Sequence, residues 1–226
     1  MHIELVLLVT ESVLLLFTIV LLLYSIREGK TRKAIIMEVG RASKILTRQE
    51  YFIAVTDSMM DAKEEVVGCI TGRIPTQEDQ KRTNDIINRI EKLVTGGVRI
   101  KYMMPKYPDR LHIGSLYSKA GAEVKYSTCL AVHDTRYIVV DDLLSVIGIA
   151  EGEGEKESTK KGYRIPSEGI AEIFKEFFYR CWESSTNYED YVREVLQQTG
   201  ASPKHLAREF HMDERELERI GKRFNS

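Results

Sequence analysis

Hydrophobic and polar positions divide the chain into an apolar N-terminal run and a longer part in which two periodicities alternate. Residues 3–24 are apolar apart from Glu4, Glu11 and a few Thr and Ser residues. From about residue 49, apolar side chains recur either at helical spacing or in short runs rich in β-branched residues. We therefore expect an N-terminal apolar helix followed by a domain of alternating helices and strands.

The alternating part predicts a sheet that is covered by helices on both sides. Helices are expected over about 49–60, 77–95, 108–120 and 167–184, strands over 65–71, 98–104, 123–126, 136–142 and 143–149, and a polar loop over 151–161. Helices that alternate with strands are typical of parallel sheets, and short turns between the later strands make this one mixed. The predicted fold class is α/β, with a mixed, mostly parallel sheet flanked by helices.

The C-terminal residues predict a small helical tail of three short helices, over 188–197, 203–210 and 214–223. The last two resemble a helix-turn-helix pair. Acidic residues nearly balance basic ones in this tail, so protein interaction or capping is favoured over DNA binding. The predicted domains are a transmembrane anchor over 1–26, a basic juxtamembrane helix over 27–48, the α/β domain over 49–185 and the tail over 186–226.

The apolar run has the length of a membrane-spanning helix, which needs roughly 20 residues. Four Lys or Arg residues follow it within 27–33 and none precedes it, so the positive-inside rule places the C-terminal part in the cytoplasm. The chain start lacks the basic residue of a cleavable signal peptide. We predict a single-pass protein of the cell membrane, in which residues 27–48 bind anionic headgroups, serve only as a topology signal, or pair two chains.

The composition otherwise describes an ordinary folded domain, with 33 Lys and Arg against 34 Asp and Glu among 226 residues. A net charge of −1 gives no basic footprint, so nucleic acid is not expected as a partner. Cys69, Cys129 and Cys181 are odd in number and far apart, and they are expected to be reduced, buried thiols. Neither a metal nor another cofactor is predicted.

The most informative segment runs from Ala131 to Asp142 and reads Ala-Val-His-Asp-Thr-Arg-Tyr-Ile-Val-Val-Asp-Asp. Arg136 is followed five residues later by Asp141, and Gly148 comes after the turn. This spacing resembles the HxKxxxxD motif of the phospholipase D-like superfamily, with Arg136 in the Lys place and Asp141 in the Asp place. In that register Asp134 stands where the family has its nucleophilic His.

The resemblance covers about residues 49–185 and implies the fold of one half of a phospholipase D-like enzyme. Enzymes of this family use one His as nucleophile and a second as general acid, so they need two copies of the motif. This chain has one copy, and its His133 is one residue early, where strand alternation would turn it away from Arg136. We therefore interpret the motif as catalytically degenerate.

Two interpretations of the motif stay open. In the first, it is only a buried strand pair joined by a tight turn at Asp141-Asp142. In the second, a pocket survives and Arg136 holds an anionic ligand bidentately. The ligand-binding residues predicted for that pocket are Asp134, Arg136, Asp141, Ser158 and Lys160.

Three functions are compatible with these observations. Our leading hypothesis is a membrane-anchored, degenerate phospholipase D-like domain that senses a ligand or assembles proteins. The first alternative is a homodimeric phosphodiesterase, a nuclease or phospholipase, with His133, Arg136 and Asp141 as catalytic residues. The second alternative is a membrane-bound regulator that binds DNA through its tail.

Overall fold

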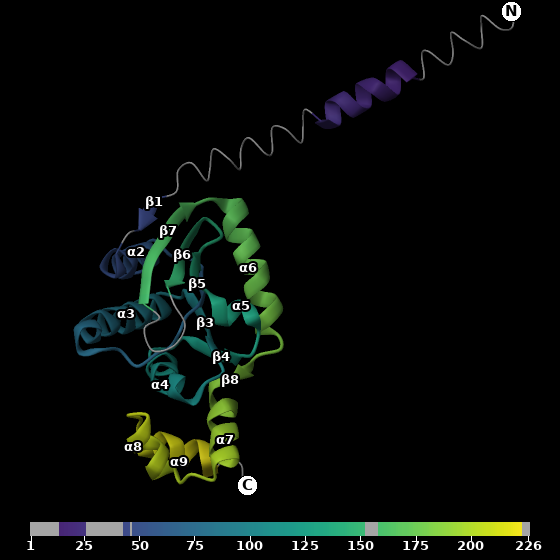
Figure 1. The fold of residues 1–226 in the computed structure, drawn as a ribbon. Coiled ribbons are helices and arrows are strands. Elements are labelled where there is room, and N and C mark those ends of the chain that lie inside the picture. The colour runs from purple at the N-terminus through teal and green to yellow at the C-terminus, as the bar shows by residue number, and fades with distance from the viewer. Residues whose placement is uncertain (1–13, 26–42, 46, 152–157, 223–226) are drawn as a thin grey trace, which may run out of the picture. The chain divides into compact units, whose positions relative to one another are not determined.

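A computed structural model describes residues 14–25, 43–45, 47–151 and 158–222 (Figure 1). The chain divides into two compact units, Met1–Arg41 and Ala42–Ser226. In the first unit residues 14–25 are helical, and the rest of the predicted apolar run lies outside the described residues. Within the described ranges, no helix is both long enough and apolar enough to cross a membrane.

The second unit is built on a mixed sheet, whose described strands follow the order β1-β7-β6-β5-β2-β3-β4-β8. These strands are β1 (Ser43–Ile45), β2 (Glu65–Cys69), β3 (Arg99–Pro105), β4 (Glu123–Ser127), β5 (Thr135–Val140), β6 (Leu144–Glu151), β7 (Ser158–Pro166) and β8 (Thr186–Asn187). The pairs β2–β3 and β3–β4 are parallel, and the other neighbouring pairs are antiparallel. The mixed α/β class is confirmed. The prediction of a mostly parallel sheet is wrong, because β5 to β7 follow one another without the helical crossovers that parallel pairing needs.

Helices cover both faces of this sheet, as predicted. They are α2 (Arg48–Met60), α3 (Gln77–Thr95), the 3-10 helix η1 (Pro108–Arg110), α4 (Leu111–Lys119), α5 (Leu130–Asp134), α6 (Glu168–Trp182), α7 (Tyr188–Thr199), α8 (Pro203–Glu209) and α9 (Glu214–Lys222). Helices α2, α3, α4 and α7 share the larger hydrophobic core with the sheet, and α5 and α6 share the smaller one.

Strand β5 contributes to both cores because its side chains alternate between the two faces. Ile138 and Val140 belong to the core under α2, α3 and α4, whereas Tyr137 and Val139 belong to the core under α6. Arg136 lies two residues before Ile138, so its side chain is directed to the side of α2 to α4.

The hairpin of β5 and β6 confirms the predicted strand pair and its tight turn. Asp141 and Asp142 have φ angles of 48° and 58°, and the Leu143 N–H donates to the Val140 carbonyl over 3.0 Å. Asp is among the residues that tolerate the left-handed region, which both central residues of this turn adopt. The turn therefore has a local sequence basis.

Three local predictions are wrong. Leu130–Asp134 is helical, so strand alternation does not govern the orientation of His133. Ser43–Ile45 is a strand paired with β7, although the basic helix is predicted to run to residue 48. The polar loop predicted over 151–161 ends early, since β7 begins at Ser158. Strand β1 depends on pairing with β7, which is far away in sequence and which local periodicity does not contain, whereas β7 pairs with its neighbour β6.

Helices α7 to α9 confirm the three predicted tail helices and belong to the same compact unit as the sheet. Glu216 of α9 is buried and accepts hydrogen bonds from Ser115 Oγ at 2.7 Å and Tyr188 Oη at 3.0 Å. Its carboxylate also lies 2.9 Å from Lys119 Nζ. A buried carboxylate with these partners fixes the tail to α4.

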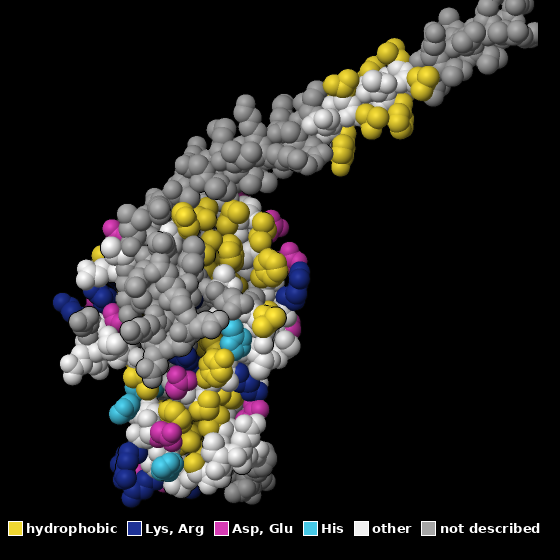
Figure 2. Space-filling model, viewed as in Figure 1, with side chains coloured by type: hydrophobic (Ala, Val, Ile, Leu, Met, Phe, Trp, Pro, Cys, Tyr) yellow, Lys and Arg dark blue, Asp and Glu magenta, His cyan; other side chains and the backbone are white. Residues whose placement is uncertain are grey.

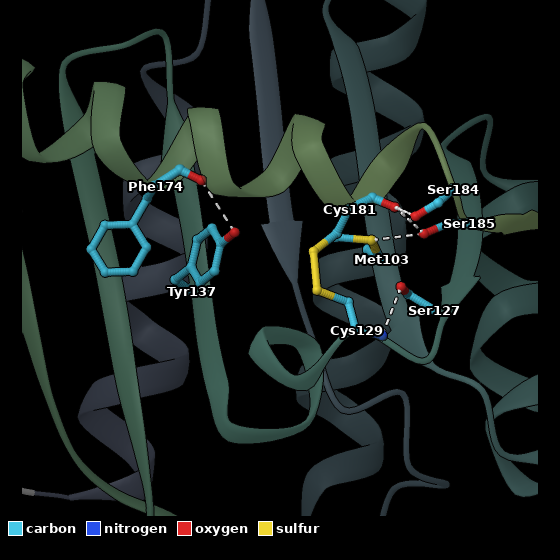
Figure 3. The surroundings of a disulfide bond; sticks show 8 residues. All are labelled: Met103, Ser127, Cys129, Tyr137, Phe174, Cys181, Ser184 and Ser185. Atoms are coloured by element: carbon cyan, nitrogen blue, oxygen red, sulfur yellow. Dashed lines mark hydrogen bonds between the residues drawn. A yellow bond between two sulfur atoms is a disulfide. The ribbon is translucent and has the colours of Figure 1, made fainter.

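A disulfide joins Cys129, just before α5, to Cys181 in the last turn of α6, with the two Cα atoms 6.2 Å apart (Figure 3). Beside it the Ser185 hydroxyl lies 3.2 Å from Met103 Sδ of β3. Cys69 is free and buried. The prediction of three reduced thiols is therefore wrong for two of them, because 52 residues separate the pair in sequence and only the fold brings them together.

Candidate functional site

A cavity of about 160 Å³ lies between the sheet and the helices α2, α3 and α4. Its walls come from these helices, from β3 and β5, and from the loop of residues 70–75 that follows β2. Ligands of open α/β sheets commonly bind beyond the carboxyl ends of parallel strands. The loop after β2 begins at such an end, so the cavity has the position expected of a binding site.

Two arginines line the cavity. Arg136 of β5 is 7% exposed and pairs across the sheet with Gly148 of β6. Arg73 comes from the loop after β2, next to Gly72 with its φ of 64°. A Cβ atom at Gly72 would lie 2.4 Å from Met104 Sδ, so this position needs glycine for both its conformation and its space. The turn at Gly72 therefore allows the loop to bring Arg73 to the same cavity as Arg136.

One carboxylate, Asp79 of α3, belongs to the described wall. It is 4% exposed, and its Oδ1 lies 3.1 Å from an Arg82 nitrogen. Its Oδ2 accepts a hydrogen bond from the Thr76 hydroxyl over 3.2 Å. The Asp79 carboxylate is therefore paired within α3 and with its N-cap residue.

Tyrosine side chains make up much of the remaining wall. Tyr51, Tyr102 and Tyr117 line the cavity, and the rings of Tyr102 and Tyr117 lie 5.2 Å apart. Burial raises the pKa of Tyr51 to about 12, and the positive charge of Arg136 opposes that rise. Burial also raises the pKa of Tyr102 and of Tyr117. At neutral pH the wall therefore presents neutral phenols, and the electrostatic field of Arg136 reaches into the cavity.

His133 lies away from this wall, at the end of α5. Its ring packs edge-to-face on Tyr107 with the centroids 5.3 Å apart, and its Nδ1 lies 3.3 Å from the Tyr107 hydroxyl. It is not among the described residues that line the cavity. His133 and Arg136 are thus close in sequence but have different surroundings.

Asp141 lies at the far end of β5 from Arg136. Its carboxylate accepts hydrogen bonds from the backbone N–H groups of Lys63, Glu64 and Glu65 at 2.6, 2.9 and 2.8 Å. These bonds connect the hairpin turn to the start of β2. The environment of Asp141 is therefore that of a structural carboxylate.

Of the other residues predicted to bind a ligand, the side chains of Asp134, Ser158 and Lys160 lie outside the described part of the structure. Arg73 and Tyr51 were missed by the sequence analysis. A glycine followed by a basic residue directly after a buried strand was the available signal for Arg73. Nothing local to the sequence connected either residue with Arg136.

A second charged cluster surrounds Glu65, on the side of α6. Its carboxylate lies 3.3 Å from Lys101 Nζ and 3.0 Å from Lys175 Nζ, and it accepts a 2.7 Å hydrogen bond from the Tyr179 hydroxyl. Burial raises the pKa of Glu65, but the Tyr179 hydroxyl and the two lysines outweigh it and hold this pKa below its usual value. All four residues have partners, so the cluster is a structural ion-pair network.

Comparison with known proteins identifies the architecture. No family model and no curated protein matches the chain. NucT from Helicobacter pylori superposes with a TM-score of 0.50 at 13% identity, over 65% of this chain and 98% of that one. Nuc from Salmonella typhimurium, a phospholipase D family member, has a TM-score of 0.47 at 14% identity, over 60% of this chain and 89% of that one. Phosphatidylserine synthase from Haemophilus influenzae has a TM-score of 0.44 at 12% identity, over 66% and 40%.

The fold is phospholipase D-like. This confirms the resemblance drawn from the motif at the level of architecture, and identities this low transfer no activity. In this domain Arg136 lines a cavity, and Asp141 supports a turn.

Proposed function

We propose that the chain is a membrane-anchored, catalytically degenerate phospholipase D-like domain that binds an anionic ligand in the cavity beside Arg136. The observation that carries this proposal is that the buried Arg136 shares the cavity with Arg73. Buried guanidinium groups bind carboxylates and phosphates through paired, charge-assisted hydrogen bonds. A domain with this cavity would act as a sensor or an assembly module whose state depends on the ligand.

The surroundings of His133 support the absence of catalysis. A nucleophile has to reach the bound phosphodiester, and His133 instead contacts Tyr107. Asp134 stands in the nucleophile's place in the motif, and a second negative charge there would repel a phosphodiester. The alternative of a homodimeric phosphodiesterase would require His133 to leave Tyr107.

The membrane anchor of this proposal rests on the N-terminal pattern. The large hydrophobic side chains of the helix over residues 14–25 are exposed, and Figure 2 shows them on the sides of the helix in view. Basic residues follow this run, which favours a cytoplasmic domain.

The Cys129–Cys181 disulfide also bears on the orientation, because such a bond is typical either of oxidising compartments or of intracellular proteins from hyperthermophiles. Fusions of alkaline phosphatase and of green fluorescent protein to the C-terminus decide the orientation, and a cytoplasmic domain gives fluorescence only.

A hydrolysis assay tests the degenerate character. The full-length chain in detergent is expected to hydrolyse neither bis(p-nitrophenyl) phosphate nor single-stranded DNA above a blank. Hydrolysis that disappears in His133→Ala would replace the proposal with the homodimeric phosphodiesterase.

The anion-binding part is tested by titration with benzoate and inorganic phosphate, in which Arg136→Gln should weaken binding. Arg164→Gln is the matched control, since Arg164 lies on β7 and is not among the described lining residues.

A further inference from the structure

Helix α6 has an exposed apolar ridge on the face of the sheet opposite to the cavity. Ile173 and Phe177 are 49% and 47% exposed, and they lie one turn apart on the helix surface. Gly169 continues this row one turn earlier, and a Cβ atom there would meet no described atom within 4 Å. We call Gly169, Ile173 and Phe177 the α6 ridge. Its three members share one exposed side of the helix.

Strands β6 and β7 extend the apolar surface beside the α6 ridge. Tyr163 of β7 is 37% exposed and pairs across the sheet with Ile147, which packs against the core under α6. Because directly paired residues point to the same face of a sheet, Tyr163 lies on the α6 face as well. Figure 2 shows hydrophobic side chains gathered on the part of the domain where α6, β6 and β7 lie in Figure 1. Exposed apolar side chains that gather in this way commonly mark an interaction surface.

The charges along α6 favour a second copy of the chain as the partner for this surface. Glu168 lies at the exposed start of the helix, and Arg180 lies in its last turn. The Arg180 guanidinium group lies 5.4 Å from the centre of the Phe177 ring and 2.8 Å from its own Glu176. A guanidinium group has five N–H donors, so this exposed one can also bind a carboxylate of a partner. In an antiparallel pair of α6 helices, Arg180 of each copy comes close to Glu168 of the other.

The α6 ridge is also self-complementary in shape. With a two-fold axis at Ile173, each Ile173 packs on the same residue of its partner. Each Phe177 then lies over Gly169 of the partner, because both residues are four positions from the axis. The absence of a side chain at Gly169 leaves room for the Phe177 ring. A two-fold contact between identical chains requires this kind of complementarity, since it uses one patch on both copies.

We infer that α6 is a homodimer interface in which two copies of the helix pack antiparallel, with Ile173 at the two-fold axis. This inference goes beyond the proposed function and does not depend on the ligand of the cavity. The cavity lies under α2, α3 and α4, on the other face of the sheet from α6. The α6 contact therefore keeps both cavities away from the interface, whereas a homodimeric phosphodiesterase would have to bring two copies of its motif together.

Oxidative cross-linking of the full-length chain in detergent micelles tests the inference. Packed helices with axes about 8–10 Å apart bring facing residues into the range of a disulfide, in which the Cα atoms lie within about 7 Å. Ile173→Cys should therefore form a covalent dimer when it is oxidised with copper phenanthroline. The native Cys69 is buried and the other two cysteines are bonded to each other, so the cross-link reports the introduced thiol.

Gly169→Cys is the matched control on the same ridge. In the antiparallel pair it is displaced from the same residue of its partner by eight residues, or about 12 Å along the helix. Its yield of covalent dimer should be at least about tenfold lower than that of Ile173→Cys. Ile53→Cys, which is 56% exposed on α2, measures cross-linking by random collision and should also give a low yield.

Light scattering of the same micelles gives a second readout, corrected for the bound detergent. The wild type should have the mass of two chains and Ile173→Asp the mass of one, whereas Ile53→Asp should remain a dimer. Equal cross-linking of Ile173→Cys and Gly169→Cys would overturn the inference, because it would mean a parallel or unspecific contact. Absence of a cross-link would also overturn it. If the Ile173→Cys thiol were then protected from a water-soluble maleimide, the α6 ridge would be assigned to detergent or to the N-terminal apolar run instead.

Discussion

The charged residues at the two ends of β5, Arg136 and Asp141, differ in what they contact, although they lie only five residues apart in the sequence. At the start of the strand, Arg136 lines a cavity together with Arg73. At the end, Asp141 holds three backbone N–H groups of the chain leading into β2. Five residues of extended chain at about 3.3 Å each place these ends about 16 Å apart. The charged residues at the two ends of this strand therefore have separate surroundings, a cavity at one end and a turn at the other.

The largest effect is expected at the Arg136 end, from the disulfide that fastens the segment before α5 to α6. Its loop of 52 residues predicts a loss of about 4 kcal/mol in the free energy of unfolding when the bond is removed. Urea unfolding of the chain with and without dithiothreitol measures this loss. The double variant Cys129→Ser/Cys181→Ser is the control and should no longer respond to the reductant. An unchanged urea midpoint in the wild type would show that α5 is held without the bond.

The next largest effect is expected at the other end of β5, from Asp141→Asn. The amide keeps one oxygen and loses the charge, so three backbone donors share a weaker acceptor, and the free energy of unfolding should fall by about 3 kcal/mol. Urea unfolding measures this fall.

Asp142→Asn is a matched control for Asp141→Asn. Asp142 lies in the same turn with a similar φ, and its carboxylate is exposed and pairs with Lys175. The loss there should be below about 1 kcal/mol. Equal losses in the two variants would mean that the turn conformation matters and the three hydrogen bonds do not.

A smaller effect, about 2 kcal/mol, is expected from Glu65→Gln, which weakens the hydrogen bonds of the partly exposed Lys101 and Lys175 to their shared carboxylate. Because the folded state lowers the pKa of Glu65, its contribution is present above the unfolded-state pKa and is lost as the pH falls through the folded-state value. The gap between wild type and variant should therefore close below about pH 4.3. Urea unfolding at a series of pH values checks this, and a gap that widens in acid would contradict the role given to Glu65.

The smallest effect is expected at Tyr51, in the cavity. The charge of Arg136 partly opposes the rise of this pKa to about 12, so Arg136→Gln should raise the pKa of Tyr51 further. Alkaline titration of phenolate absorbance, compared with the same variant carrying Tyr51→Phe, isolates the signal. A fall in this pKa would show that the guanidinium group does not face the phenol.

Most helices and strands could be predicted from local periodicity, because each buries one face along its own length. The apolar face of α3 and the Gly96-Gly97 pair after it are an example. The direction of β5 could not be predicted in this way. It lies antiparallel to β2, and that pairing joins Val66 to Val140, with β3 and β4 between them in the sequence.

The candidate site was predictable only in part, for the same reason. Arg136 could be predicted as a site residue because of its spacing to Asp134 and Asp141 in the sequence. Arg73 and Tyr51 belong to the cavity only through the sheet order, which places the loop after β2 and the helix α2 beside β5. The pairing of Cys129 with Cys181 likewise depends on where α6 crosses the sheet.

The two outermost described strands are very short, with three residues in β1 and two in β8. A long exposed edge offers unpaired N–H and C=O groups to any passing chain, and a short edge is one of the ways in which proteins avoid joining into fibres. Anchoring would concentrate many copies in two dimensions, where such encounters are frequent. The short strands β1 and β8 would then disfavour aggregation of neighbouring copies through their sheet edges. If the chains form a specific oligomer, we expect its interface to be made by helices.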